Sequence, residues 1–264
     1  MGMLLAIDVG NSNIVIGVFD GAKLTATWRL QTERDRTAGE LSVLVDGFFV
    51  KDGMKKSAIE GAVVSSVVPS QTGPAIGMVR HLFDRDALLV EPAVNGGMPI
   101  RYERPADLGA DRLVTAVGAY AMFGEQAGLP LIVCDFGTAT KIDAVSAAGE
   151  YLGGTISAGV SILADALSQR TALLPLVEIR KPASVIGRTT VSGIEAGLFY
   201  GYLGMVEGII TRMRAELGGK AICVATGGLA PLIAPETTLI DHTHPDLTLQ
   251  GMRIVWERNM TLKI

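Results

Sequence analysis

Short apolar runs separated by polar turns organise this chain. Runs at 4–7 and 14–19 flank one polar turn, and runs at 131–134 and 141–145 flank a second turn. Each set predicts a buried strand, a tight turn and a second strand. The repetition predicts that the chain is a duplication of one half, with a nucleotide-binding hairpin in each copy.

Strands and helices alternate along the rest of the sequence, which predicts helices packed on a largely central sheet. Further strands are expected at 23–29, 60–68, 87–90 and 222–226, and helices at 38–51, 71–83, 109–123, 161–167 and 191–217. An irregular connector with three prolines covers 92–105. We place the domain boundary shortly after it, which divides the chain into 1–113 and 114–264.

The two polar turns carry the residue types of a phosphate site. Residues 8–13 read Asp-Val-Gly-Asn-Ser-Asn, and residues 135–140 read Asp-Phe-Gly-Thr-Ala-Thr. Glycine lets backbone N–H groups approach an anion closely. Asp8 and Asp135 repel phosphate unless a cation or water lies between, so the pattern predicts a metal nucleotide. The alternative is a pair of ordinary hairpin turns.

A third candidate site lies where the helix at 109–123 begins. Asp111 and Arg112 follow Gly109 and Ala110 there. One interpretation makes Asp111 a base that orients a substrate hydroxyl and Arg112 a fork for a carboxylate. The other is a helix N-terminal acid beside a solvated arginine.

Glycines mark three further segments. The segment 153–160 predicts a turn that opens the following helix, where N–H groups could reach phosphate or substrate; an ordinary helix entry is the alternative. The pair 227–228 after a buried strand predicts close approach to a nucleoside, although many strands end in this way. In the helix at 191–217 the glycines predict close packing against a neighbouring helix or a second subunit. They are Gly193, Gly197, Gly201, Gly204 and Gly208.

Composition narrows the function classes. Hydrophobic residues make up 48% and charged residues 19%, so the chain buries a large interior. A net charge of -4 argues against a general nucleic-acid binder. Charges interrupt the apolar helix at 191–217, which predicts a buried helix and no membrane span. With no leader pattern and two cysteines expected to be reduced, we expect a cytoplasmic protein.

Common nucleotide and zinc motifs are missing from the sequence, including the Gly-x-x-x-x-Gly-Lys phosphate loop. The His-Thr-His segment at 242–244 is expected to be a surface turn.

Seven motifs in order resemble those of type III pantothenate kinases, and the similarity extends through 247–251. They are residues 8–13, Trp28–Arg29 with 36–40, 65–69, 109–112, 135–140, 153–156 and 225–228. The resemblance implies an α/β, duplicated actin-like and sugar-kinase-related ATPase fold. Residues 1–113 and 114–264 would each form an ATPase-like domain with a mixed central sheet and flanking helices.

The same resemblance implies ATP-dependent phosphorylation of pantothenate to 4'-phosphopantothenate, the first step of coenzyme A biosynthesis, by a homodimer. Asp111 would accept the proton, and Asp135 would bind a monovalent cation such as K⁺ or NH₄⁺. A divalent metal, Mg²⁺, would accompany ATP. The implied ATP contacts are Asp8, Val9, Gly10, Asn11, Ser12, Asn13, Ile14, Val15 and Thr138. The implied pantothenate contacts are Tyr102, Gly109, Ala110, Asp111, Arg112 and Thr190.

Lys141 departs from the family pattern, which commonly has threonine or another uncharged residue there. Three interpretations of this lysine are open. Its side chain points into solvent, its charge replaces the monovalent cation, or its presence indicates a relative that has lost kinase activity. A nucleotide-binding accessory or regulatory protein is therefore a rival function, and a kinase for another hydroxylated acid is a third. The enzyme is favoured because a pure binding module needs no base, whereas this chain retains together Asp8, Asp111, Arg112, Asp135 and Thr138.

Overall fold

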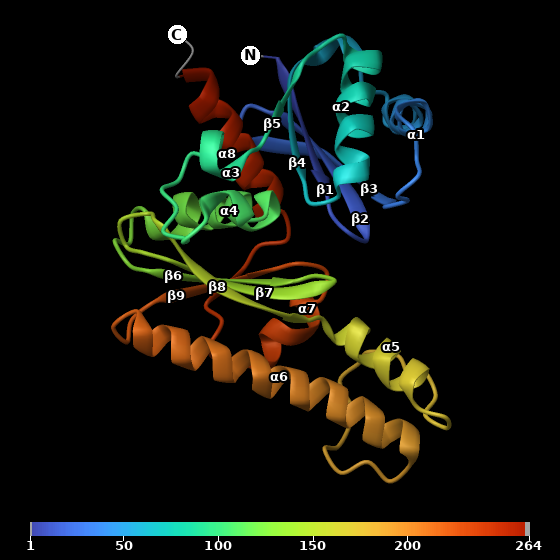
Figure 1. The fold of residues 1–264 in the computed structure, drawn as a ribbon, viewed down its shortest axis with the longest axis vertical. Helices are drawn as coiled ribbons and strands as arrows, with labels where there is room; N and C mark the ends of the chain where they lie inside the picture. The colour runs from blue at the N-terminus through green and yellow to red at the C-terminus, as the bar shows by residue number, and fades with distance from the viewer. Residues whose placement is uncertain (1, 262–264) are drawn as a thin grey trace. The chain divides into compact units, whose positions relative to one another are not determined.

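The computed structural model describes residues 2–261 and divides them into two compact units (Figure 1). The first unit ends at Gly118 and takes in the chain again from Asp246 onward, and the second unit is Ala119–Pro245. The sequence-based division into 1–113 and 114–264 stays a prediction. The return of the C-terminal segment to the first unit was not anticipated.

A five-stranded mixed sheet, in the order β3-β2-β1-β4-β5, forms the centre of the first unit. β1 pairs antiparallel with β2 and parallel with β4. The alternation of side chains in β1 places Leu5, Ile7 and Val9 in one apolar core. The strands are β1 (Met3–Val9), β2 (Asn13–Asp20), β3 (Lys23–Gln31), β4 (Ile59–Ser66) and β5 (Ala87–Leu89).

Helices α1 (Ala38–Lys51) and α2 (Pro69–Phe83) cover that core face of the sheet (Figure 1). α1 begins where the sequence predicted, because Thr37 and Glu40 form a capping box that satisfies N–H groups of the first turn. The other helices of this unit are α3 (Pro92–Asn95), α4 (Ala110–Ala119) and α8 (Leu247–Thr261), with short 3₁₀ turns at Lys56–Ala58 and Pro105–Asp107.

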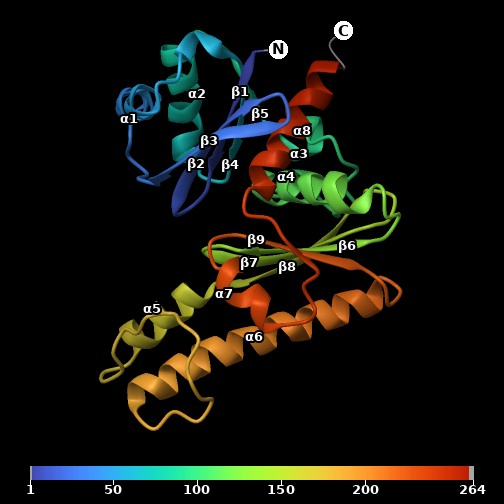
Figure 2. The same ribbon diagram turned by 180° about the vertical axis from the view of Figure 1, so that it is seen from behind.

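The C-terminal helix α8 packs on the opposite face of the same sheet (Figure 2). Two glycines of the sheet make room for it. A Cβ at Gly61 would lie 2.4 Å from the Trp256 ring, and one at Gly17 would lie 2.9 Å from Leu249. The last 15-residue helix is thus part of the N-terminal fold.

The second unit has its own five-stranded mixed sheet, in the order β10-β9-β6-β7-β8. β6 pairs antiparallel with β7 and parallel with β9, which repeats the pairing of β1 with β2 and β4. The predicted fold class is confirmed by this repetition. The strands are β6 (Leu131–Phe136), β7 (Ala139–Val145), β8 (Tyr151–Ala158), β9 (Ile222–Thr226) and β10 (His242–Thr243).

The long helix α6 (Thr190–Glu216) lies along one face of this sheet (Figures 1 and 2). Phe199, Tyr202 and Val206 project from it into the apolar core of the unit. In the described chain α6 is therefore buried on one face, and its glycine face is exposed. The remaining helices are α5 (Val160–Arg170) and α7 (Ala230–Ile233), with a π-helical turn at Tyr120–Gly124 and a 3₁₀ turn at Ala234–Glu236.

Two local predictions need correction. The segment 153–160 is largely strand, because β8 runs to Ala158 and pairs with β7. A Cβ at Gly154 would lie 2.3 Å from Asp143 Oδ1, so this glycine serves close strand packing. His242 and Thr243 form the exposed edge strand β10 beside β9, where a turn was expected.

Across residues 2–261, none of the helices combines the length and the apolar character needed to cross a membrane.

Candidate active site

The first hairpin presents a polar tip on a buried base. Val9 and Ile14 face each other across β1 and β2, and both side chains are buried in the core. Asn11 and Ser12, at the tip, are exposed. The apolar pair fixes the hairpin, and the polar pair lies at its exposed tip.

Neighbouring strands hold this tip in place. The Gly10 N–H donates to the Asn13 carbonyl at 3.0 Å. The Thr32 hydroxyl donates to the Gly10 carbonyl at 2.7 Å, and the Thr32 N–H donates to the Ser12 carbonyl at 3.0 Å. The loop is therefore preorganised before any ligand arrives. The sequence analysis missed Thr32, which lies at the end of the third strand.

The second hairpin has a built-in ion pair. β6 and β7 are joined through Gly137 and Thr138, and Asp135 lies directly opposite Lys141 in the antiparallel register. The Lys141 ammonium donates to Asp135 Oδ2 at 2.8 Å. The side chains are 17% and 22% exposed, so the pair is partly buried. Thr138, at the tip, is exposed.

Two glycines let the backbone close around this hairpin. Gly227 has a φ of 92°, and a Cβ there would lie 2.7 Å from Asp135 Oδ1 and from the Phe136 backbone. A Cβ at Gly159 would lie 2.4 Å from the Thr138 carbonyl oxygen. The turn after β9 and the start of α5 thus both meet the Asp135 loop within the second unit.

Tyr202 of α6 anchors the same hairpin from below. Its hydroxyl and the Thr140 hydroxyl share a buried hydrogen bond, and its ring meets Phe136 edge-on. Burial raises the pKa of Tyr202 to about 12. No sequence signal joined Thr140 to Tyr202, because 62 residues separate them.

The third candidate site clusters at the start of α4. Asp111 Oδ1 accepts from the Arg112 N–H at 2.8 Å. The Arg112 guanidinium donates to the Tyr102 hydroxyl at 3.2 Å and lies 5.8 Å from the ring centroid. Arg112 is 6% exposed, so of the two interpretations the one with a solvated arginine does not hold.

The close packing of Gly109 completes this cluster, because a Cβ there would lie 2.7 Å from Asp111 Oδ1. Ala110 is buried at the first turn of α4. Thr190 belongs to the second unit, where it is exposed at the first turn of α6 behind the Thr189 N-cap. The structure thus brings Tyr102, Gly109, Asp111 and Arg112 together within one unit.

Lys141 bears on whether the second hairpin can hold a monovalent cation. The ammonium already lies on the carboxylate that would be the cation's charged ligand. A second unit charge about 4 Å from that ammonium is repelled by about 4 kcal/mol at an effective dielectric constant of about 20. The residues of this loop therefore do not fit a resident monovalent cation.

Residues 2–261 contain no group of three or more His, Cys, Asp or Glu side chains placed to hold a metal. Mg²⁺ commonly binds through substrate phosphates, water and one or two carboxylates, and Asp8 at the end of β1 supplies a carboxylate beside the first polar tip.

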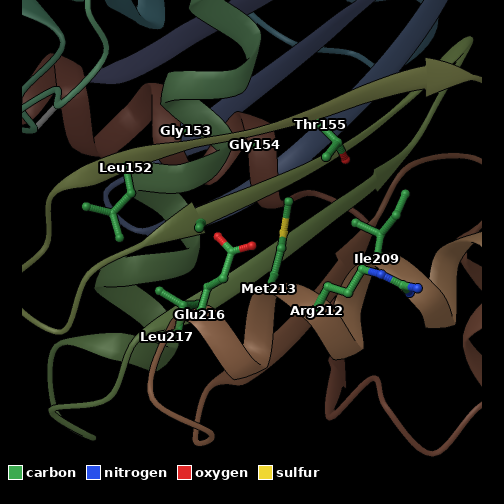
Figure 3. A pocket seen from close by; sticks show the side chains of 10 residues that line it. Leu152, Gly153, Gly154, Thr155, Ile209, Arg212, Met213, Glu216 and Leu217 are labelled. Carbon is green, nitrogen blue, oxygen red and sulfur yellow. The ribbon is translucent and has the colours of Figure 1, made fainter.

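A cavity of about 470 Å³ lies elsewhere in the second unit, between β8 and the C-terminal half of α6 (Figure 3). Leu152 and Thr155 line it from β8, and Met213 and Leu217 line it from α6. Gly153, Gly154 and Thr155 of the glycine-rich segment also line it, whereas none of the residues assigned to ATP, pantothenate or a metal does.

Two repeated units that each open on an Asp-x-Gly hairpin define the class of actin-like and sugar-kinase-related ATPases. A solved structure agrees with this fold. The putative 2-dehydro-3-deoxygalactonokinase of Sinorhizobium meliloti superposes with a TM-score of 0.62 at 15% identity, over 97% of this chain and 96% of that one.

Sequence comparison identifies the family within that class. The model of the type III pantothenate kinase family matches residues 4–212. The type III pantothenate kinase of Moorella thermoacetica is 50% identical over 97% of this chain and 100% of its own length. The one from Anaeromyxobacter sp. strain K is 48% identical over the same shares. The chain belongs to the type III pantothenate kinase family.

Proposed function

We propose that this protein transfers the terminal phosphoryl group of MgATP to the terminal hydroxyl of pantothenate, yielding 4'-phosphopantothenate for coenzyme A biosynthesis. The observation that carries the proposal is the cluster of Asp111, Arg112 and Tyr102. Asp111 offers a carboxylate held by the Arg112 backbone N–H, and the buried Arg112 guanidinium donates to a phenol; this set suits a substrate that carries both a hydroxyl and a carboxylate.

Asp111 acts as the proton acceptor. Phosphoryl transfer through a loose transition state needs the hydroxyl proton only late, so placing the carboxylate matters more than its basicity. The Arg112 N–H holds Asp111 Oδ1 at the start of α4. Arg112, Tyr102 and the backbone of Gly109 and Ala110 bind the acid end of pantothenate, where the guanidinium offers a fork to its carboxylate.

ATP binds along residues 8–15 and Thr138. The buried side chains of Val9 and Ile14 leave only their backbone for contact, whereas Asn11, Ser12 and Asn13 offer side-chain donors. Asp8 would hold Mg²⁺, directly or through its water shell, and the metal would neutralise charge on the phosphates. Gly10 lets the loop approach the phosphates, and Val15 extends the contact along β2.

A homodimer formed through α6 completes the proposal. A Cβ at Gly193, Gly197, Gly201 or Gly204 would meet no heavy atom of the described residues within 4 Å. No neighbouring helix of the described chain therefore occupies this face, and a second copy is the occupant we propose. Thr190, in the first turn of the same helix, then contacts pantothenate near the subunit interface.

Free Cys134 and Cys223 support our proposal that the enzyme works in the reducing cytoplasm.

The test measures ADP formation from ATP with pantothenate and with a panel of related hydroxy acids. We expect turnover with pantothenate and ³¹P resonances of 4'-phosphopantothenate. Turnover only with another acid would replace the substrate, and nucleotide binding without any turnover would favour the accessory protein.

Asp111→Asn should retain ATP binding and lose about 100-fold or more in kcat, because it removes a general base without removing volume. Asp107→Asn is the matched control, since Asp107 is an exposed acid in the preceding turn. Steady-state kinetics and calorimetric ATP titration check both variants. Unchanged turnover in Asp111→Asn would remove this residue from the mechanism.

A further inference from the structure

We propose that the Lys141 ammonium permanently takes the place of a monovalent cation at Asp135, so that this enzyme works without K⁺ or NH₄⁺. The expected effect on turnover rests on the proposed kinase function. The structural basis of the inference is separate, because it comes from the ion pair in the second hairpin.

The strand register builds this ion pair into the fold. Asp135 and Lys141 are directly opposite residues of antiparallel strands, and such neighbours hold their Cβ atoms within about 5.5 Å. A lysine in this position reaches its partner without any rearrangement of the backbone. The observed Nζ–Oδ2 distance of 2.8 Å is that of a charge-assisted hydrogen bond.

The surroundings fix both ends of the pair. Gly227 lies against Asp135 Oδ1, and Tyr202 holds Thr140, the residue before Lys141, through its hydroxyl. Since both side chains are less than one quarter exposed, water screens the pair less than it screens a surface ion pair. The lysine charge is therefore local and fixed.

The electrostatic role follows from the loop that carries the pair. A carboxylate next to a phosphate-binding turn repels the nucleotide unless a positive charge neutralises it. A mobile cation supplies that charge only when it is bound, whereas Lys141 supplies it at every salt composition. A second cation at the same carboxylate would meet the ammonium.

The first experiment compares turnover of the wild-type protein in K⁺, NH₄⁺, Na⁺ and tetramethylammonium buffers of equal ionic strength. ADP is quantified by chromatography, so that no cation-dependent coupling enzyme enters. We expect rates that agree within about twofold in all four buffers, because no site selects K⁺ or NH₄⁺. A strict requirement for K⁺ or NH₄⁺ would overturn the proposal.

The second experiment creates the dependence. Lys141→Thr should lose about 100-fold in turnover in tetramethylammonium and regain most of it in K⁺ or NH₄⁺. Lys220→Thr, the same change at an exposed lysine of the same unit, should behave as wild type. Lys141→Gln serves as a second neutral variant if the threonine variant does not fold. Cation-independent activity in a folded neutral variant would overturn the proposal.

A binding measurement separates this inference from the kinase assignment. ATP affinity is titrated calorimetrically in K⁺ and in tetramethylammonium for wild type and Lys141→Thr. ²⁰⁵Tl⁺ resonance broadening reports cation binding directly. We expect cation-linked ATP affinity and thallium binding only in the variant. If no hydroxy acid is phosphorylated in any buffer, the proposed function fails, and these binding data alone decide the role of Lys141. Thallium binding at this loop in wild type would contradict it.

Discussion

Asp135 forms its ion pair with its cross-strand neighbour, Lys141. The short connection through Gly137 and Thr138 makes Asp135 and Lys141 partners by register, so this contact could have been predicted from the hairpin alone. Tyr202 could not, because its bond to Thr140 joins segments far apart in sequence. Local patterns indicate cross-strand pairs, whereas contacts between a helix and a distant strand depend on the packing of the whole unit.

Tyr202→Phe tests that distant contact at neutral pH. The variant leaves the buried Thr140 hydroxyl without its partner, and we expect a loss of about 1 kcal/mol in the free energy of unfolding. Denaturant titration measures this loss. Tyr200→Phe, whose ring packs on Phe199 of the same helix, is the matched control.

The same variant should show a distinct alkaline behaviour. The pKa of Tyr202 is raised to about 12 by burial, above the ordinary value of 10.0. The folded state therefore holds this proton more tightly, and its stabilisation is complete below about pH 10 and lost as pH rises to about 12. The stability gap between wild type and Tyr202→Phe should narrow across that window. A gap independent of pH would contradict this assignment.

At the scale of elements, the pattern of apolar runs and polar turns predicted both hairpins and the position of α1. The error at 153–160 had a physical cause, since glycines that permit close strand packing look like turn glycines in a sequence. Gly154 permits close strand packing. Gly227 permits a close approach as well, and it also has the positive φ of a turn glycine. The contact between Tyr102 and Arg112 could not be predicted from the sequence, because it depends on how the segment between them folds.

Gly227→Ala should destabilise the second unit by about 1–3 kcal/mol. The new Cβ would meet Asp135 Oδ1 and the Phe136 backbone at 2.7 Å, in a backbone conformation that favours glycine. Gly228→Ala is the neighbouring control, because a Cβ there meets nothing within 4 Å. Urea unfolding of both variants checks this expectation. An equal effect of the two substitutions would show that the close contact is unimportant.

At the scale of the whole molecule, the two faces of α6 differ in burial. One face carries the core of the second unit, and the other exposes four glycines at close spacing. The sequence indicated close packing there without saying which partner provides it. Within residues 2–261 no other helix covers these glycines, and the subunit interface stays our proposal for this face.

Gly201→Leu distinguishes the stability of the helix in the monomer from its packing in the proposed dimer. In the monomer, leucine at an exposed helix position should raise helix stability by up to about 1 kcal/mol relative to glycine. In the dimer, its bulk should keep the helices apart and shift the protein toward monomer. Light scattering coupled to size-exclusion chromatography measures the shift. The control is Gly47→Leu, at an exposed position of α1. A dimer unaffected by Gly201→Leu would move the interface elsewhere.

The return of α8 to the first sheet has a consequence for biosynthesis. The strands β1, β2 and β4 leave the ribosome early, but the helix that fills the notches at Gly17 and Gly61 is made last. The continuous segment Ala119–Pro245 has all its internal partners well before then. A nascent chain therefore lacks the Trp256 and Leu249 contacts on this face of the sheet until α8 has been made, and a premature stop before α8 removes those contacts permanently.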